Sequence, residues 1–175
     1  MRKVFFGCVL LAAAAAMQTG CVKPAPPVHL YRMGEKVQVG PFIYTVFEAT
    51  WLPQLGEAMQ ARQPARRFLI VHLSVTNSGA EELSVPALSL VDDAGYVHTE
   101  TFDGRNVPSW WGLIRKLKPA DTLEGNILFD VQPKSYKLKL DDDSDPERRA
   151  MVEMPLRFGL EEPTMPGALS TPGRQ

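Results

Sequence analysis

Apolar and polar positions alternate along most of the chain between residues 33 and 158. In residues 67–79, RFLIVHLSVTNSG, four apolar side chains fall on one face of an extended segment, and more varied side chains alternate with them. A period of two is typical of a β-strand that buries one face. The buried face is predicted to consist of Leu69, Val71, Leu73 and Val75, and the strand to end in a turn at residues 77–79.

The same alternation predicts further strands. They cover residues 42–51, 122–131, 135–142 and 150–158, together with two strands in residues 82–100 that a turn at residues 92–95 joins. Pro86 removes a backbone donor from the first of those two strands, which favours a sheet edge. Helical signal is scarce, because Pro64 limits residues 56–67 to a short turn. The pattern therefore predicts an all-β fold, an antiparallel β-sandwich.

The N-terminal residues have the layout of an export signal. Arg2 and Lys3 precede an apolar segment at residues 4–16. That segment is shorter than the roughly 20 residues that a membrane-spanning helix needs. We therefore expect residues 1–20 to be a signal peptide that is removed on export.

Cys21 follows the sequence Gln18-Thr19-Gly20, which resembles a bacterial lipobox, although Gln18 stands where an apolar residue is usual. Lipoprotein processing acylates such a cysteine on its sulfur and its amine, and more than one acyl chain gives stable anchoring in a bilayer. The alternative is a bystander thiol after conventional cleavage at residues 14–16, but a free thiol is readily oxidised in an exported protein. We therefore predict that Cys21 is lipidated.

The rest of the chain is predicted to have three parts. Residues 21–32 combine the acylated cysteine with a proline-rich tether, residues 33–158 form the sandwich, and residues 159–175, rich in proline and glycine, form a disordered tail. Val22 stands where an aspartate commonly retains a lipoprotein in the inner membrane. In an envelope with two membranes, the outer membrane is therefore favoured.

The charge balance excludes one class of partner. The chain has 175 residues, the composition of a globular protein with one core, and a formal net charge of -1. Loss of residues 1–20 takes Arg2 and Lys3 from the 19 basic residues and leaves 17 against 20 acidic ones, a net charge of -3. This balance argues against a nucleic-acid partner, which usually binds a basic surface.

The three histidines do not form a recognisable catalytic motif. His29 falls in the tether, while His72 and His98 fall in predicted strands, and no serine elbow or His-Glu-x-x-His pattern accompanies them. Two strand histidines could bind a metal if a sheet brought them together, but surface histidines are far more common. We expect no enzymatic activity and no cofactor.

Four carboxylates lie at and after the end of the predicted strand at residues 135–142. Oxygen ligands suit calcium, but the segment lacks the glycine and the distal glutamate of a helix-loop-helix calcium site. A solvated acidic turn is the favoured interpretation, and calcium binding is the alternative. The weak candidate ligands are Asp141, Asp142, Asp143 and Asp145.

Trp110 and Trp111, bracketed by Ser109 and Gly112, form the most suggestive binding motif. Aromatic side chains bury a large area at low entropic cost, so a pair on a loop suits a protein partner or a sugar face. Alternatively, adjacent residues of an extended segment point to opposite faces, which would put one tryptophan in the core and the other over a sheet edge. The pair supplies the candidate partner contacts, and Trp51 is expected in the core.

Several segments resemble one family. GEKVQVGPFIYTVFEATW, FLIVHLSVTNSGAEELSV, LSLVDDAGYVHT and LKPADTLEGNILFDVQPKSYKLKL, within residues 34–141, are similar to the telokin-like domain of unknown function of bacterial lipoproteins and secreted proteins. The resemblance implies an immunoglobulin-like β-sandwich that acts outside the cytoplasm as a binding or interaction module. It carries no catalytic residues. SWWG and DDDSDPERR depart from the family pattern.

These observations predict a membrane-anchored envelope lipoprotein that acts as a non-enzymatic protein-interaction or structural module. Its expected partners are the lipid bilayer, through acylated Cys21, and an unidentified envelope protein or ligand. The alternative function is calcium or small-ligand binding in the envelope.

Overall fold

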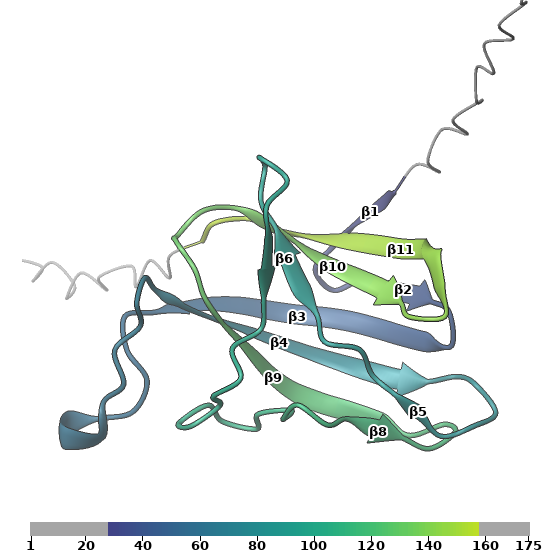
Figure 1. The fold of residues 1–175 in the computed structure, drawn as a ribbon, viewed down its shortest axis with the longest axis horizontal. Coiled ribbons are helices and arrows are strands. Elements are labelled where there is room, and N and C mark those ends of the chain that lie inside the picture. Colours follow the sequence, from purple (N-terminus) through teal and green to yellow (C-terminus); the bar gives the residue numbers. More distant parts are fainter. Residues whose placement is uncertain (1–27, 158–175) are drawn as a thin grey trace, which may run out of the picture.

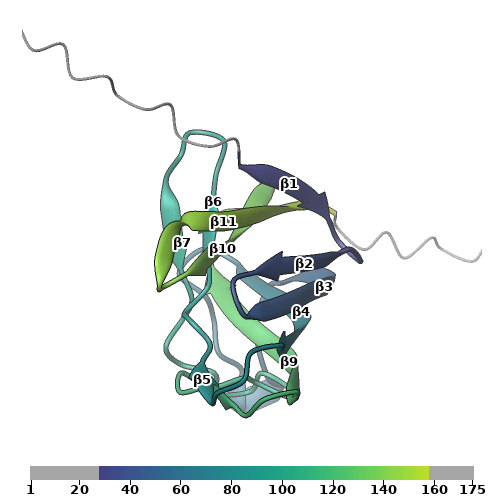
Figure 2. The ribbon, with the colours of Figure 1, turned by 90° about the vertical axis from the view of Figure 1, so that its right-hand side faces the viewer.

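The computed structural model describes residues 28–157. They form a β-sandwich with a five-stranded sheet (order β1-β11-β10-β6-β7) and a four-stranded sheet (β2-β3-β4-β9), with a two-stranded sheet (β5-β8) beside them (Figures 1 and 2). The strands are β1 His29–Arg32, β2 Lys36–Val39, β3 Phe42–Leu52, β4 Phe68–Asn77, β5 Leu83–Ser84, β6 Ser89–Val91, β7 Val97–Thr99, β8 Lys116–Leu117, β9 Thr122–Asp130, β10 Tyr136–Asp142 and β11 Asp145–Met154. No helix in the described residues is long and apolar enough to cross a membrane.

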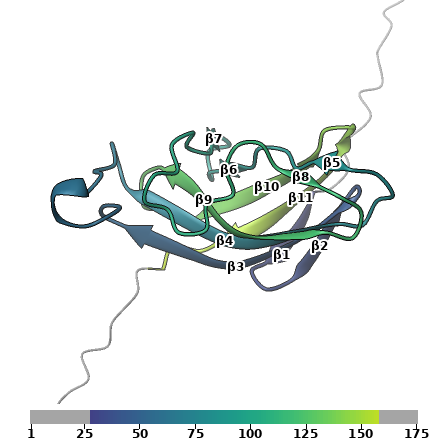
Figure 3. The same ribbon diagram turned by 90° about the horizontal axis from the view of Figure 1, so that it is seen from below.

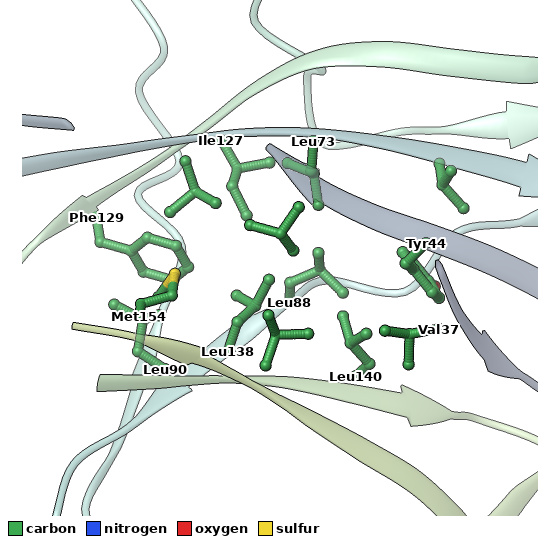
Figure 4. Packing of buried hydrophobic residues seen from close by; sticks show 14 of the residues in the cluster. Val37, Tyr44, Leu73, Leu88, Leu90, Ile127, Phe129, Leu138, Leu140 and Met154 are labelled. Carbon is green, nitrogen blue, oxygen red and sulfur yellow. The ribbon is translucent and has the colours of Figure 1, made fainter. Parts of the chain in front are cut away.

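The core lies between the two large sheets. The alternating residues of β4 that were predicted to face inward are buried, at 1% exposure or less. Figure 4 shows Leu73 and Ile127 of the four-stranded sheet facing Leu138 and Leu140 of the five-stranded sheet. Burial of each such side chain contributes about 1.5–3 kcal/mol. The predicted all-β, immunoglobulin-like sandwich is confirmed, with antiparallel pairing throughout except between β1 and β11.

Most predicted strands correspond to observed ones. Residues 42–51, 122–131 and 135–142 match β3, β9 and β10, and residues 56–67 contain only the short 3-10 helix η1 Ala58–Gln60. The predicted strand at residues 150–158 is β11, which begins earlier and ends at Met154, directly before Pro155. Proline at this position removes the next backbone donor and so ends the strand.

The prediction of two strands in residues 82–100 was wrong, because the structure has three. Pro86 lies between β5 and β6, where the chain passes from the two-stranded sheet to the five-stranded sheet. The missing donor thus marks a crossing between sheets rather than a sheet edge. The turn at residues 92–95 does join two strands, β6 and β7.

The first described strand, β1, begins at His29, within the range assigned to the tether. β1 pairs in parallel with β11, with His29 opposite Ala150 and Arg32 opposite Glu153. Tyr31 of β1 packs against the main core, which explains why the chain is ordered before Met33. The predicted signal peptide, Cys21, most of the tether and the C-terminal tail lie outside the described residues.

Asn77 joins two turns at the end of β4. Its side chain is fully buried; Nδ2 donates to the carbonyls of Glu81 (2.7 Å) and Leu117 (2.9 Å), and Oδ1 accepts from the backbone of Gly79 (2.8 Å). Both N–H donors and the oxygen of this buried amide are thus paired, and unpaired groups in the interior would cost free energy.

We therefore predict that Asn77→Ala lowers the free energy of unfolding by about 2–4 kcal/mol, because the buried Leu117 carbonyl and the partly buried Glu81 carbonyl and Gly79 N–H lose their partner. Urea denaturation measures the loss. The matched control is the neighbouring Ser78→Ala, which removes one exposed hydrogen bond to the Pro41 carbonyl. The control should cost about 1 kcal/mol or less; equal costs for the two variants would contradict the assigned role.

Candidate interaction surface

Two irregular segments form a third layer on the outer side of the four-stranded sheet. The first, called here the arm, comprises residues 53–67, connects β3 to β4 and projects beyond their ends (Figures 1 and 3). The second, the edge loop, comprises residues 100–115 and connects β7 to β8. Together they form contacts between side chains that the sequence alone did not predict to be neighbours.

The edge loop covers the free edge of β9. The backbone N–H groups of Thr101 and Trp111 donate to the carbonyls of Leu128 (2.7 Å) and Asn126 (3.0 Å), and Asn126 N–H donates to the Ser109 carbonyl (2.9 Å). An uncovered edge strand would offer these groups to other chains. The loop therefore protects β9 from unwanted strand pairing.

The tryptophan pair is divided between two apolar clusters. Trp111 is 6% exposed and belongs to the main core, whereas Trp110 is half-buried and packs against a second cluster. This is the arrangement of the alternative interpretation, with adjacent side chains on opposite faces. Because Trp111 is buried, the pair does not offer two free indoles, and a partner contact at Trp110 stays a prediction. Trp51 lies in the main core, as predicted.

Two glycines make room for this loop. A Cβ atom at Gly104 would overlap the Trp110 ring, and one at Gly125 would overlap the Ser109 carbonyl oxygen. The close approach of the loop to β9 therefore requires Gly125, and the packing of Trp110 within the loop requires Gly104.

The second cluster fixes the arm to the sheet. It comprises Leu55 of the arm, Val107 of the edge loop, Phe68 and Leu128, with Leu52, Ile70 and Trp110 packed around it. Polar contacts reinforce it. Arg62 donates to the Asp103 carbonyl (2.8 Å) and lies over the Phe68 ring, and the Asp130 carboxylate accepts from the backbone of Ala65 (2.6 Å) and Arg66 (2.8 Å).

A buried ion pair closes the edge loop. Glu100 and Arg115 pair at its two ends with side chains that are 3% and 1% exposed. Arg115 also donates to the Gly112 carbonyl (2.8 Å), Glu100 accepts from Leu88 N–H (2.6 Å), and the guanidinium lies 5.3 Å from the Trp111 ring centre. These additional contacts satisfy charges that would otherwise be costly to bury.

The arm and the edge loop expose large apolar side chains to solvent. Met59 at the tip of the arm is fully exposed, Ile114 is 86% exposed and Phe102 75% exposed, and Leu113 is half exposed. A hollow of about 530 Å³ lies between the two segments and is lined by Met59, Gln60, Ala61, Arg62, Arg105 and Asn106. Asp103 pairs with Arg105 beside it, and the Arg105 hydrogen bonds lower the pKa of Asp103 to about 2. We call these apolar side chains and this hollow the arm surface.

The histidines do not meet. His72 lies on β4 in the four-stranded sheet and His98 on β7 in the five-stranded sheet, while His29 contacts Tyr31 on β1. Among residues 28–157, no group of three or more His, Cys, Asp or Glu side chains is arranged to hold a metal ion.

The acidic run lies in the hairpin between β10 and β11. Asp141 pairs with Lys139 (2.8 Å), Asp145 pairs with Arg148 (3.1 Å), and Asp142 accepts from the Ser144 hydroxyl (2.6 Å), which lowers its pKa. Asp143 is exposed. Arg148 also lies 3.8 Å from Asp142, so the carboxylates of this hairpin are paired with basic side chains or a hydroxyl instead of converging on one centre.

Comparison with known families decides the relationship. The model of the domain of unknown function DUF4352 matches residues 31–147. The chain belongs to the DUF4352 family. No curated protein matches the chain.

Solved structures support the same fold. The yjhA protein of Bacillus subtilis is 16% identical over 70% of this chain and 98% of its own, with a TM-score of 0.54. A conserved hypothetical protein of Bacillus anthracis is 14% identical over 69% of this chain and 94% of its own, with a TM-score of 0.51. The ycdA protein of Bacillus subtilis, described as a candidate lipoprotein, has the same identity and TM-score over 69% of this chain but only 38% of its own.

The DUF4352 segments identified in the sequence have structural roles. Asn77 organises two turns and Asp130 holds the base of the arm, as described above.

The turn at residues 92–95 is the third example. Asp92 is buried and accepts from Lys134 Nζ (2.6 Å) and from the backbone of Ala94 (3.0 Å) and Tyr96 (2.9 Å), with His98 Nε2 at 3.3 Å. Sequence reasoning placed Asp92 in the turn but missed its contact with Lys134, because the two residues are 42 positions apart.

The Lys134 hydrogen bond, with help from Tyr96 N–H and His98, holds the pKa of Asp92 well below its ordinary range. A lowered carboxyl pKa contributes stability above the ordinary value near pH 4, and this contribution is lost as the pH falls towards the folded value. We predict that Asp92→Asn has a lower urea midpoint than wild type at pH 7 and a smaller further loss between pH 4 and pH 2.5. The exposed neighbour gives the control: Asp93→Asn should keep the wild-type dependence, and an Asp92→Asn curve parallel to wild type would refute the assignment.

Proposed function

We propose that this protein is a lipid-anchored module of the bacterial cell envelope that presents the arm surface to a partner protein and performs no catalysis. The export signal and the cysteine after a lipobox-like step support the anchor. The description of a structural relative as a candidate lipoprotein is consistent with it. Four large apolar side chains that the arm and the edge loop expose, Met59, Phe102, Leu113 and Ile114, support the interaction role, because exposed apolar surface is typical of sites that bind a partner.

The observation that carries the proposal is the position of β1 relative to the arm. His29 pairs with Ala150, whereas the chain turns at Gly34, whose N–H donates to the carbonyl of Val46 in the middle of β3. From Val46, β3 continues for six more residues towards the arm, and β1 starts in the opposite direction (Figure 1). At about 3.3 Å per residue, His29 lies roughly 30 Å from the start of the arm along the long axis.

The tether limits how far His29 can lie from the bilayer. Residues 21–28 reach at most about 29 Å when fully extended. A bilayer holding Cys21 therefore lies within this distance of His29. When the long axis of the sandwich stands upright on the bilayer, the tip of the arm with exposed Met59 is far from the bilayer and open to a partner protein.

Metabolic palmitate labelling tests the anchor. The wild-type chain should incorporate label, and Cys21→Ala should lose it together with its membrane association, because Cys21 is the proposed acylation site. The matched substitution Cys8→Ala, within the predicted signal peptide, should be labelled like wild type. Label that persists without Cys21 would overturn the anchor.

Cross-linking in intact cells tests the interaction role. A photoreactive residue at position 59 or 114 should capture one discrete envelope protein, and Met59→Ser/Ile114→Ser should lower its recovery at least tenfold, since central apolar contacts dominate interface energies. The control is Val97→Ser, which changes an exposed apolar residue of β7 outside the arm surface. Equal recovery with all three proteins would exclude the arm surface as the contact.

A further inference from the structure

A second group of side chains gathers on the outer face of the four-stranded sheet, where a β-bulge interrupts β3. The pairing of β3 with β4 shifts between Val46, opposite Leu73, and Glu48, opposite His72, so Phe47 is the extra residue. Its ring is 46% exposed and lies 5.4 Å from the His72 ring. Bulges of this kind re-aim a side chain and are frequent beside functional sites.

Hydrogen bonding fixes which nitrogen of His72 carries the proton. Asn126 Nδ2 donates to the Pro108 carbonyl (2.7 Å), so Asn126 Oδ1 is the atom that faces His72 Nδ1 (3.1 Å). An amide oxygen only accepts, and therefore Nδ1 must donate. In the neutral imidazole, Nε2 is then an acceptor.

The neutral ring leaves two acceptors facing each other. Nε2 lies 3.4 Å from Glu124 Oε1, and the two side chains are 35% and 61% exposed. Glu48, next to His72 in the sheet register, adds a second carboxylate, which accepts from the Thr50 hydroxyl. Within the described chain, neither glutamate has an ion pair with lysine or arginine. The two carboxylates can therefore accept hydrogen bonds from a positively charged donor.

We propose that Phe47, Glu48, His72 and Glu124 bind the guanidinium group of an arginine side chain on a partner protein. A guanidinium stacks on an aromatic face and presents a planar set of N–H donors, which match the exposed ring, the two carboxylates and Nε2. An ammonium group supplies the charge without the flat stacking surface. This contact lies outside the arm surface and does not depend on the proposed membrane anchor.

One arginine of the chain itself, Arg157, lies near this group. A hollow of about 270 Å³ beside Phe47 and Glu48 is also lined by Arg157. Arg157 is therefore close enough to the carboxylate of Glu48 and the ring of Phe47 to compete for them, and its removal should strengthen binding of an external arginine.

Nuclear magnetic resonance titration of the full chain tests the site, with Nα-acetyl-L-arginine amide as the probe and the ring signals of Phe47 and His72 as the readout. We expect saturable shifts, with binding about tenfold weaker for the citrulline analogue, which has the same shape and no charge. Phe47→Leu should weaken binding about threefold and Glu124→Gln about tenfold. Arg157→Gln should strengthen it.

Glu82→Gln is the control, because Glu82 is an exposed carboxylate on the loop before β5. It should bind the probe like wild type. Thermal unfolding of each variant verifies that it is folded before titration. Equal binding of arginine and citrulline analogues, or wild-type affinity in Glu124→Gln, would overturn the site. If Nα-acetyl-L-lysine amide bound more tightly than the arginine probe, the choice of a guanidinium group would be overturned.

Discussion

The buried ion pair between Glu100 and Arg115 is the contact on which the outer architecture depends. It closes the edge loop at both ends, and the same guanidinium lies beside Trp111, so that the loop is attached to the main core. From that fixed position, the loop covers β9, holds Trp110 against the second cluster and supports the arm. A pair of charges, each costly to bury alone, thus determines where an apolar surface is displayed.

The sandwich and its outer layer have different tasks. The two large sheets supply a rigid frame whose side chains alternate between core and solvent. The arm and the edge loop add a small second core, and beyond it their apolar side chains face solvent. The division allows the displayed residues to change without disturbing the frame, because the side chains that attach the outer layer, among them Leu55, Val107 and Trp111, are buried and separate from the exposed ones.

The alternation of β4 was sufficient to predict its buried face, because burial in a sheet follows a period of two. Local patterns could not predict β1, whose pairing with β11 joins residues about 120 positions apart. Nor could they pair Glu100 with Arg115 or Asp92 with Lys134, since neither contact has a fixed sequence spacing. The tryptophan pair was ambiguous for a related reason: its two alternatives differ only in what covers β9, and that depends on the whole edge loop.

The parallel pairing of β1 with β11 has a mechanical consequence. If the N-terminus is pulled while another molecule holds the arm, the force acts along the direction of β1. The hydrogen bonds between β1 and β11 are evenly spaced along that line. They would therefore carry the load together in shear instead of opening one after another, and a four-residue edge strand would resist detachment better than its length suggests.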